Sequence, residues 1–286
     1  MRALRFSAVL GFRIEKETEK AIFENKELLL NIAGERIFAE LKKLLLGDYC
    51  ENVLLKYKEV LAVVIPELEA CFDFEQRSKW HLYDVYTHSV KSVAISPEKD
   101  YMRFSLLLHD IGKPYCKTTD ANGQDHFKGH PVISAELAQK ALSRFNPSND
   151  FKNKVLTLIS NHDYFITRKR SNIKKWLRLL GEELTYDYID LKIADLKTHN
   201  LELSQHEIDE LYYIKDLTKE IIESNEPYKI SDLKINGFDL QKIGYKGAEI
   251  SYELEKLIKD VSGNPELNKK ENLLHLAKQD YKKELS

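Results

Sequence analysis

The sequence predicts an all-α protein built from several helical modules. Leu, Lys, Glu, Ile and Ala recur at three- and four-residue spacing along most of the 286 residues, which is the period of amphipathic helices. Only 11 Gly and 7 Pro interrupt this pattern. The chain also lacks a run of segments with the apolar and polar alternation of strands. These observations together favour helices throughout.

The first helices are predicted from apolar periodicity and from the glycines that follow it. The opening RALRFSAVLGF predicts a helix that ends at Gly11, because glycine readily adopts the conformation that closes a helix. A second helix is expected through AIFENKELLLNIAG, ending at Gly34, and a third through ERIFAELKKLLLG. The N-terminal part of the chain is therefore predicted to be a small helical bundle.

Later elements follow from the same signals. The stretch PVISAELAQKALSRF predicts a helix that begins at Pro131, since proline fits the first turn of a helix. The stretch LELSQHEIDELYYIKDLTKEIIE predicts a long amphipathic helix, and the last segment predicts a turn followed by a charged helix. Three histidines beside these helices, His199, His206 and His275, are expected on the surface.

Composition excludes several classes of protein. The net charge is -2, from 44 basic and 46 acidic residues, so any nucleic-acid binding must come from a local patch. The three cysteines, Cys50, Cys71 and Cys116, are scattered, which favours a reducing cytoplasm over a disulfide framework. The apolar stretches are too short to span a bilayer, and the N-terminus lacks the pattern of a secretion signal. Oligomeric state is left open.

The segment YMRFSLLLHDIGKP is the most informative stretch. Its apolar run, Phe104 to Leu108, predicts a buried helix that ends on the adjacent His109 and Asp110. A buried imidazole beside a buried carboxylate must pair or bind a ligand, because burying either one alone is costly. Taken by itself, the doublet is more often a hydrogen-bonded core pair than a metal site. Lys113 adds a cation at the same place.

Further histidines and a distant aspartate make a metal site the preferred interpretation. His88 lies on an amphipathic segment, His130 follows a glycine, His162 ends an apolar helix, and Asp195 lies in YIDLKIADLKTHN. This order resembles the HD superfamily of metal-dependent phosphohydrolases. The resemblance implies that His88, His109, Asp110 and Asp195 hold one ion, and that His130 and His162 hold a second, bridged by Asp110. His126 is the alternative to His130, and Asp163 could orient His162.

These residue types suit the chemistry that the resemblance implies. Imidazole and carboxylate ligands together favour borderline divalent metals such as Mn, Fe, Ni or Zn, with one or two ions bound. Such ions polarise a phosphoryl oxygen and acidify a bound water, so hydrolysis by a metal-bound hydroxide is expected. Asp110 and Lys113 are the expected catalytic residues, with Lys113 steadying the phosphate.

The segments around this module resemble a second family. RALRFSAVLGF, GERIFAELKKLL and VIPELEACF before it, and ISDLKINGFDLQKIGYKG after it, are similar to the neck and C-terminal body of bacterial CCA-adding tRNA nucleotidyltransferases and poly(A) polymerase-like proteins. In many bacterial members an HD domain occurs at this place in the chain. The resemblance covers essentially all 286 residues and implies tRNA, or an RNA 3′ end, as a partner.

One feature of that family is missing from this sequence. Members that add nucleotides begin with a β-sheet head that carries a Gly-rich loop and a paired Asp-x-Asp for two magnesium ions, and the sequence contains neither. The family's Glu-Asp-x-x-Arg motif would fall just before residue 1. Nucleotide addition is therefore not expected from this chain alone, which is either a C-terminal portion of such an enzyme or a relative without a head.

Two groups of basic residues are candidates for RNA binding, one around Trp176 and one near the N-terminus. A solvated helix face is the simpler explanation of a charge run, and the family resemblance makes contacts with RNA phosphates an equal alternative. The candidate residues are Arg2, Arg5, Arg168, Lys169, Arg170, Lys174 and Lys175.

The sequence thus predicts a helical neck and RNA-binding body over 1–70, an HD phosphohydrolase domain over 71–202 and a helical body or tail over 203–286. The expected reaction is hydrolysis of a 2′,3′-cyclic phosphate or a phosphomonoester of RNA or a nucleotide, with binding of tRNA by the helical regions. Two alternatives remain: a non-catalytic tRNA-binding fragment, or a stand-alone HD nucleotide phosphohydrolase without an RNA role.

Overall fold

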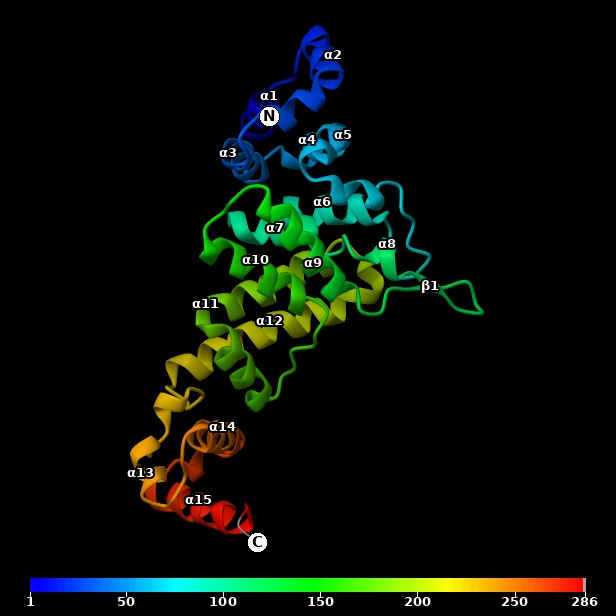
Figure 1. Ribbon diagram of the computed structural model, residues 1–286. Helices are drawn as coiled ribbons and strands as arrows, with labels where there is room; N and C mark the ends of the chain where they lie inside the picture. The colour runs from blue at the N-terminus through cyan, green and yellow to red at the C-terminus, as the bar shows by residue number, and fades with distance from the viewer. Residues whose placement is uncertain (285–286) are drawn as a thin grey trace. The chain divides into compact units, whose positions relative to one another are not determined.

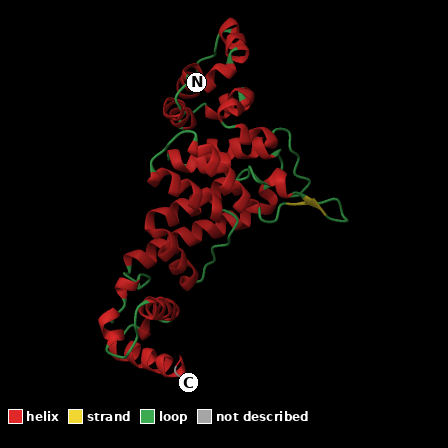
Figure 2. Cartoon of the chain, in the orientation of Figure 1, coloured by secondary structure: helices red, strands yellow, loops and turns green. Residues whose placement is uncertain are grey.

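The computed structural model describes residues 1–284 and confirms the all-α fold class. Within this range the sheet content is one antiparallel pair of short strands, β1 (Thr118–Thr119) and β2 (Asp125–His126), as Figure 2 shows. The chain divides into two compact units. The first contains Met1–Tyr164 and Asp187–Ile208, and the second contains Phe165–Tyr186 and the residues from Asp209 onward. None of the described helices is both long and apolar enough to cross a membrane.

The first unit begins with short helices (Figure 1). The α-helices here are α1 (Arg2–Leu10), α2 (Lys16–Glu24), α3 (Gly34–Leu45), α4 (Cys50–Lys56) and α5 (Lys58–Val64), and the 3-10 helices are η1 (Lys26–Asn31) and η2 (Pro66–Cys71). Helix α1 ends at Gly11 as predicted: Gly11 has a φ of 70° and donates its N–H to the carbonyl of Ser7. The left-handed φ explains why glycine stands there.

The prediction for Gly34 was wrong. The second helix ends at Glu24 and gives way to η1, and Gly34 begins α3. The physical reason is a close approach of two backbones, because a Cβ on Gly34 would lie 1.9 Å from the carbonyl oxygen of Arg144. Glycine is needed here for space, a requirement that local sequence pattern does not reveal.

Helix α7 (Asp100–Leu108) lies at the centre of the first unit. Its residues Met102 to Leu108 are all buried, which confirms the buried helix predicted from the apolar run. It packs against α3, α6 (Val85–Ile95) and α10 (Asn149–Asn161). The ring of Phe104 lies 5.4 Å from that of Phe38 in α3 and 5.4 Å from that of Phe151 in α10. These contacts fix the position of the helix end, where the His-Asp doublet follows.

The remaining elements of this unit are α8 (Lys113–Cys116), the β1–β2 hairpin, α9 (His130–Ser143) and the first-unit portions of α11 (Arg170–Leu196) and α12 (Leu201–Glu223). The hairpin projects away from the helices (Figure 1). Helix α9 begins with His130 followed by Pro131, as the proline predicted. Helix α11 is interrupted at Gly181, whose φ of 77° and ψ of 174° are not helical.

The second unit has its own apolar core. Its elements, besides its portions of α11 and α12, are η3 (Ile230–Asp232), α13 (Gly237–Gln241), α14 (Ala248–Gly263), η4 (Pro265–Leu267) and α15 (Lys270–Glu284). Leu240 of α13, Leu257 and Val261 of α14, and Leu273 of α15 are completely buried in one cluster. Residues 165–186, which the sequence analysis placed with the metal domain, belong to this compact unit.

Candidate metal centre

Six polar side chains converge within the first unit, and they are the six that the sequence analysis selected as metal ligands. They come from separate helices: His88 lies in α6, His109 and Asp110 directly follow α7, His130 begins α9, His162 directly follows α10, and Asp195 lies in the last turn of α11. Helix ends suit this role, because a side chain there can turn away from the helix axis while the helix itself stays packed.

Asp110 stands between two groups of imidazoles. Its Oδ2 lies 3.2 Å from Nε2 of His109 and 3.8 Å from Nε2 of His88. Its Oδ1 lies 3.2 Å from Nε2 of His130 and 3.6 Å from Nε2 of His162. Each carboxylate oxygen thus faces a different pair of ring nitrogens, which is the arrangement that a bridging ligand between two ions requires.

Asp195 completes the first of these groups. Its Oδ1 lies 2.8 Å from Nε2 of His88 and 3.4 Å from Nε2 of His109. The two histidines, Asp110 and Asp195 therefore direct two kinds of donor atom, nitrogen and oxygen, at one small volume. Such a set of imidazole nitrogens and carboxylate oxygens could hold a borderline divalent metal.

Backbone carbonyls orient the rings. The Nδ1 atoms of His109, His130 and His162 each lie 2.7 or 2.8 Å from the carbonyl oxygen three residues earlier in the chain. Because a carbonyl only accepts hydrogen bonds, the hydrogen-bond network places the proton on Nδ1 in all three rings. The Nε2 lone pairs then face inward, as they do in metal-ligating histidines whose other nitrogen donates a hydrogen bond.

Two features of this arrangement call for a cation. Nε2 of His130 lies 2.9 Å from Nε2 of His162, although both atoms carry lone pairs in the neutral rings, so a proton or a metal ion must relieve their repulsion. In addition, Nε2 of His109 is buried without a well-formed hydrogen bond among the described residues. A buried polar atom of this kind is rare and points to a missing partner. The six side chains therefore fit the binding of divalent metal.

Burial and charge act in opposite directions on the doublet. Burial lowers the pKa of His109, but the neighbouring Asp110 and Asp195 outweigh it and raise the pKa to about 10. Burial raises the pKa of Asp110, because it disfavours the charged carboxylate. The positive charges of His109 and Lys113 outweigh this effect and hold the pKa well below its usual value. Since a metal ion must displace the proton of His109, metal binding should weaken as the pH falls.

Lys113 is buried beside the doublet. Its Nζ lies 2.6 Å from Oδ2 of Asp110 and donates a hydrogen bond of 2.8 Å to Oε1 of Gln76. Only 6% of the side chain is exposed, so the ammonium group is shielded from water. Gln76 was not identified from the sequence, because it lies in an irregular segment before α6 that carries no motif.

The expectation that His199 lies on the surface was wrong. Only 12% of its side chain is exposed, and its ring stacks on that of His88 with centroids 5.0 Å apart and an interplanar angle of 13°. Burial lowers the pKa of His199 to about 4 and that of His81, its neighbour, to about 2. One signal could have revealed His199, since it follows Asp195 by four residues and so continues the same helical face.

Two further candidates, His126 as the alternative to His130 and Asp163 as the residue that could orient His162, have exposed side chains. The side chain of His126 is 49% exposed, and its Nε2 lies 2.9 Å from Oδ2 of Asp120 in the β1–β2 hairpin. Asp163 is exposed. The structure therefore places His130, and not His126, beside His162.

Acidic partners neutralise much of the predicted basic patch. Arg168 pairs with Glu210, Arg170 pairs with Glu220 and Glu226, and Lys174 lies 2.9 Å from Glu226. Lys174 is also buried, with a side chain 1% exposed, and donates to the carbonyl of Ser262. Lys169 and Lys175 are exposed.

The N-terminal arginines lie on α1. Arg5 pairs with Glu40 of α3 at 2.6 Å, and the guanidinium groups of Arg2 and Arg5 lie 5.6 and 4.0 Å from the ring centre of Phe6. Cation–π contacts of this kind leave the edge of a guanidinium group free to donate hydrogen bonds.

Comparison with known families identifies two domains. Residues 11–72 match the family described as the probable RNA and SrmB-binding site of polymerase A, and residues 81–200 match the HD domain. The second match contains all six candidate ligands as well as His81 and His199.

The chain is similar to tRNA nucleotidyltransferases and to a CCA protein. The A-adding tRNA nucleotidyltransferase of Deinococcus radiodurans is 29% identical over 211 residues, which cover 68% of this chain and 47% of the relative. The CC-adding tRNA nucleotidyltransferase of Thermus thermophilus is 28% identical over 73% of this chain and 51% of the relative. The multifunctional CCA protein of Nitrosospira multiformis is 28% identical over 57% and 40%.

The chain thus spans about half the length, or less, of the curated relatives it matches. The chain carries a polymerase A-type RNA-binding domain and a domain of the HD superfamily, and it is homologous to the C-terminal part of the CCA-adding tRNA nucleotidyltransferases.

Proposed function

We propose that the first unit is a metal-dependent phosphohydrolase that acts on a phosphate ester at the end of an RNA or on a nucleotide. One observation carries the proposal: the two oxygens of Asp110 face separate pairs of imidazole nitrogens, at 3.2 and 3.8 Å on one side and 3.2 and 3.6 Å on the other. A purely structural core pair would need neither the second pair of histidines nor inward-facing Nε2 lone pairs.

The chain's own residues have distinct roles in this proposal. His88, His109, Asp110 and Asp195 would hold one divalent ion, and Asp110, His130 and His162 would hold a second. Bound ions of this kind supply Lewis-acid polarisation of a phosphoryl oxygen and acidify a water molecule. The three backbone carbonyls keep the imidazole lone pairs aimed at the centre.

Lys113 would stabilise negative charge on the phosphate. Its ammonium group lies beside Asp110 and is held there by Gln76. With metal bound at Asp110, Lys113 would share that carboxylate, and its ammonium group could donate to a phosphate oxygen while the hydrogen bond to Gln76 limits its position.

The RNA part of the proposal comes from the rest of the same unit. Residues 11–72 match an RNA-binding domain and belong to the compact unit that contains the metal centre. The similar proteins are named as tRNA nucleotidyltransferases, so we propose tRNA as the partner and a 2′,3′-cyclic phosphate or a phosphomonoester as the substrate. Arg2 is the proposed phosphate contact in this unit. Lys169 and Lys175 are separate candidates in the second unit, and buried Lys174 is left out.

The test compares the wild-type chain with Asp110→Asn and with Asp73→Asn as a matched control. Asp73 is also an aspartate in an ion pair, with Lys58, but its side chain is 84% exposed. Metal content is measured by elemental analysis after loading with Mn²⁺, and hydrolysis of 2′,3′-cyclic AMP is then followed. Removal of the bridging carboxylate should reduce the rate by about 100-fold or more, whereas the control should retain it.

Three results would change the conclusion. A wild-type chain that binds metal but hydrolyses neither the cyclic nucleotide nor a phosphomonoester, while still binding tRNA, would favour the non-catalytic RNA-binding alternative. Hydrolysis that tRNA does not inhibit would favour a nucleotide phosphohydrolase without an RNA role. Equal rates for the wild type and Asp110→Asn would refute the assignment of the metal centre.

A further inference from the structure

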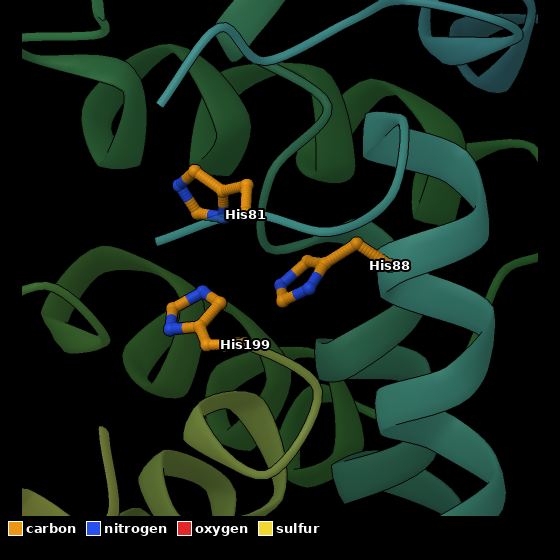
Figure 3. A group of neighbouring side chains, drawn as sticks. All are labelled: His81, His88 and His199. Atoms are coloured by element: carbon orange, nitrogen blue, oxygen red, sulfur yellow. The ribbon is translucent and has the colours of Figure 1, made fainter. Parts of the chain in front are cut away.

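A second cluster of histidines lies beside the metal centre. Figure 3 shows the rings of His81, His88 and His199 directed toward one another, with His81 on the segment before α6, His88 on α6 and His199 on the turn after α11. One ring nitrogen from each residue lies within 4.8 Å of those of the other two. The HD ligand set described above includes His88 but neither of the other two.

Backbone pairing builds this cluster. His81 and His199 form an isolated antiparallel β-bridge, and the N–H of Asn200 donates a 2.8 Å hydrogen bond to the carbonyl of Trp80. Two chain segments more than a hundred residues apart are thereby fixed side by side. The ring of His81 meets that of His199 edge-on, with centroids 4.5 Å apart and an interplanar angle of 82°. The rings are therefore positioned by the fold and not by contacts with solvent.

Three nitrogens of the cluster lack partners. Nδ1 of His81 and both Nδ1 and Nε2 of His199 are buried and make no hydrogen bond within the described residues. Buried polar atoms are rarely left in this condition. A cation would accept the one lone pair that each neutral ring carries.

The cluster also has an entrance. A cavity of about 430 Å³ lies against His81 and is lined by the acidic residues Asp73, Glu75 and Asp84 and by the basic residue Arg77. Lys58 pairs with Asp73, and Asp125 pairs with Arg77, so Glu75 and Asp84 leave the cavity with negative charge. Such charge raises the local concentration of cations, and an ion can approach the histidines from the side of His81.

We propose that His81, His88 and His199 form an additional metal position that takes an imidazole-preferring cation such as Zn²⁺ and competes with the HD position for His88. The three donors are imidazoles, and one carboxylate lies beside them: Oδ1 of Asp195 is 2.8 Å from Nε2 of His88 and 3.9 Å from Nε2 of His199. Imidazole sets favour Zn²⁺, Ni²⁺ or Cu²⁺ over Mg²⁺ and Mn²⁺.

The competition follows from the two nitrogens of His88. Its Nδ1 lies 2.8 Å from Oγ1 of Thr198, and that hydroxyl donates to the carbonyl of Asp195. The hydroxyl proton is thus already used, so Nδ1 of His88 is the donor in its contact with Thr198. Only Nε2 remains for a metal, and it can ligate one ion at a time. An ion in the tris-imidazole position therefore removes a ligand from the HD position.

The experiment counts Zn²⁺ per chain by equilibrium dialysis in an Asp110→Asn background. This variant lacks the carboxylate shared by both HD positions, so the tris-imidazole position should account for about one remaining ion. Adding His81→Gln or His199→Gln should lower the affinity for that ion at least 10-fold. Adding His126→Gln, which changes an exposed histidine in the β1–β2 hairpin, should leave it unchanged.

Two results would overturn the inference: an Asp110→Asn chain that binds no Zn²⁺, or bound Zn²⁺ that is insensitive to His81→Gln and His199→Gln. If circular dichroism shows that Asp110→Asn does not fold, the comparison is made in the wild-type background by the visible absorption of bound Co²⁺. The strong bands of a tetrahedral imidazole site should then disappear in His199→Gln and persist in His126→Gln. Metal binding is the readout in every arm, so absence of hydrolytic activity refutes the proposed function alone.

Discussion

Asp110 should be the carboxylate on which the stability of the first unit depends most strongly. Its side chain is 2% exposed and lies 2.6 Å from the ammonium group of Lys113, which is 6% exposed. Replacing Asp110 by Asn leaves a buried ammonium group without a counter-charge. Breaking a buried pair in this way typically costs about 3–5 kcal/mol of the free energy of unfolding. The exposed pair of Lys58 and Asp73 should contribute about 0–1 kcal/mol when broken in the same way.

The assay is equilibrium unfolding in guanidinium chloride in the presence of a chelator, followed by circular dichroism. Asp110→Asn should lose about 3 kcal/mol or more, and Asp73→Asn should lose less than about 1 kcal/mol. The double variant Asp110→Asn with Lys113→Met should recover part of the loss, because it leaves no uncompensated charge in the core.

Adding metal provides the second half of the same prediction. A ligand at 100 times its dissociation constant stabilises the native state by about 2.7 kcal/mol. The wild type should gain this amount from Mn²⁺, and Asp110→Asn should gain little. The reasoning is refuted if Asp110→Asn unfolds within about 1 kcal/mol of the wild type in chelator and gains as much from Mn²⁺.

Two further predictions concern packing and pH. Gly34→Ala should lower the free energy of unfolding by about 1–3 kcal/mol, since the added Cβ would lie 1.9 Å from the carbonyl oxygen of Arg144. Denaturant unfolding measures this change, and an unchanged midpoint concentration of denaturant would contradict it. Burial raises the pKa of Asp125, but hydrogen bonds from Lys117 and Arg77 outweigh it and hold that pKa below the usual value. The carboxylate therefore stabilises the fold above the unfolded-state pKa of about 4 and loses this effect as the pH falls below it. The melting temperature of Asp125→Asn should consequently fall less than that of the wild type between pH 5 and pH 2.

The sequence predicted the all-α fold class, and it also pointed to the six side chains that lie together around Asp110. Apolar periodicity is a local property, and the HD signature is an ordered set of residue types, so both can be recognised before the chain is folded. Gly34 shows what a local sequence pattern cannot reveal. Its role depends on the backbone of Arg144, which is 110 positions away, and no local pattern records such an approach.

His81 and His199 illustrate the same limit at the candidate site. Each looks like an isolated histidine in the sequence, and only the β-bridge between their segments brings them together. Gln76 was missed for a related reason, because its hydrogen bond to Lys113 depends on tertiary structure. The neutralisation of Arg168 and Arg170 by glutamates in α12 and beyond was equally beyond the reach of a charge count.

The distance along the chain between His88 and Asp195 has a consequence for biosynthesis. The two side chains that meet at 2.8 Å are 107 positions apart, so the proposed first metal position cannot form until the ribosome has made almost the whole HD domain. Contacts of such long sequence separation form late, because loop closure must precede them. A nascent chain that stops short of Asp195 would therefore offer an ion only part of the proposed ligand set.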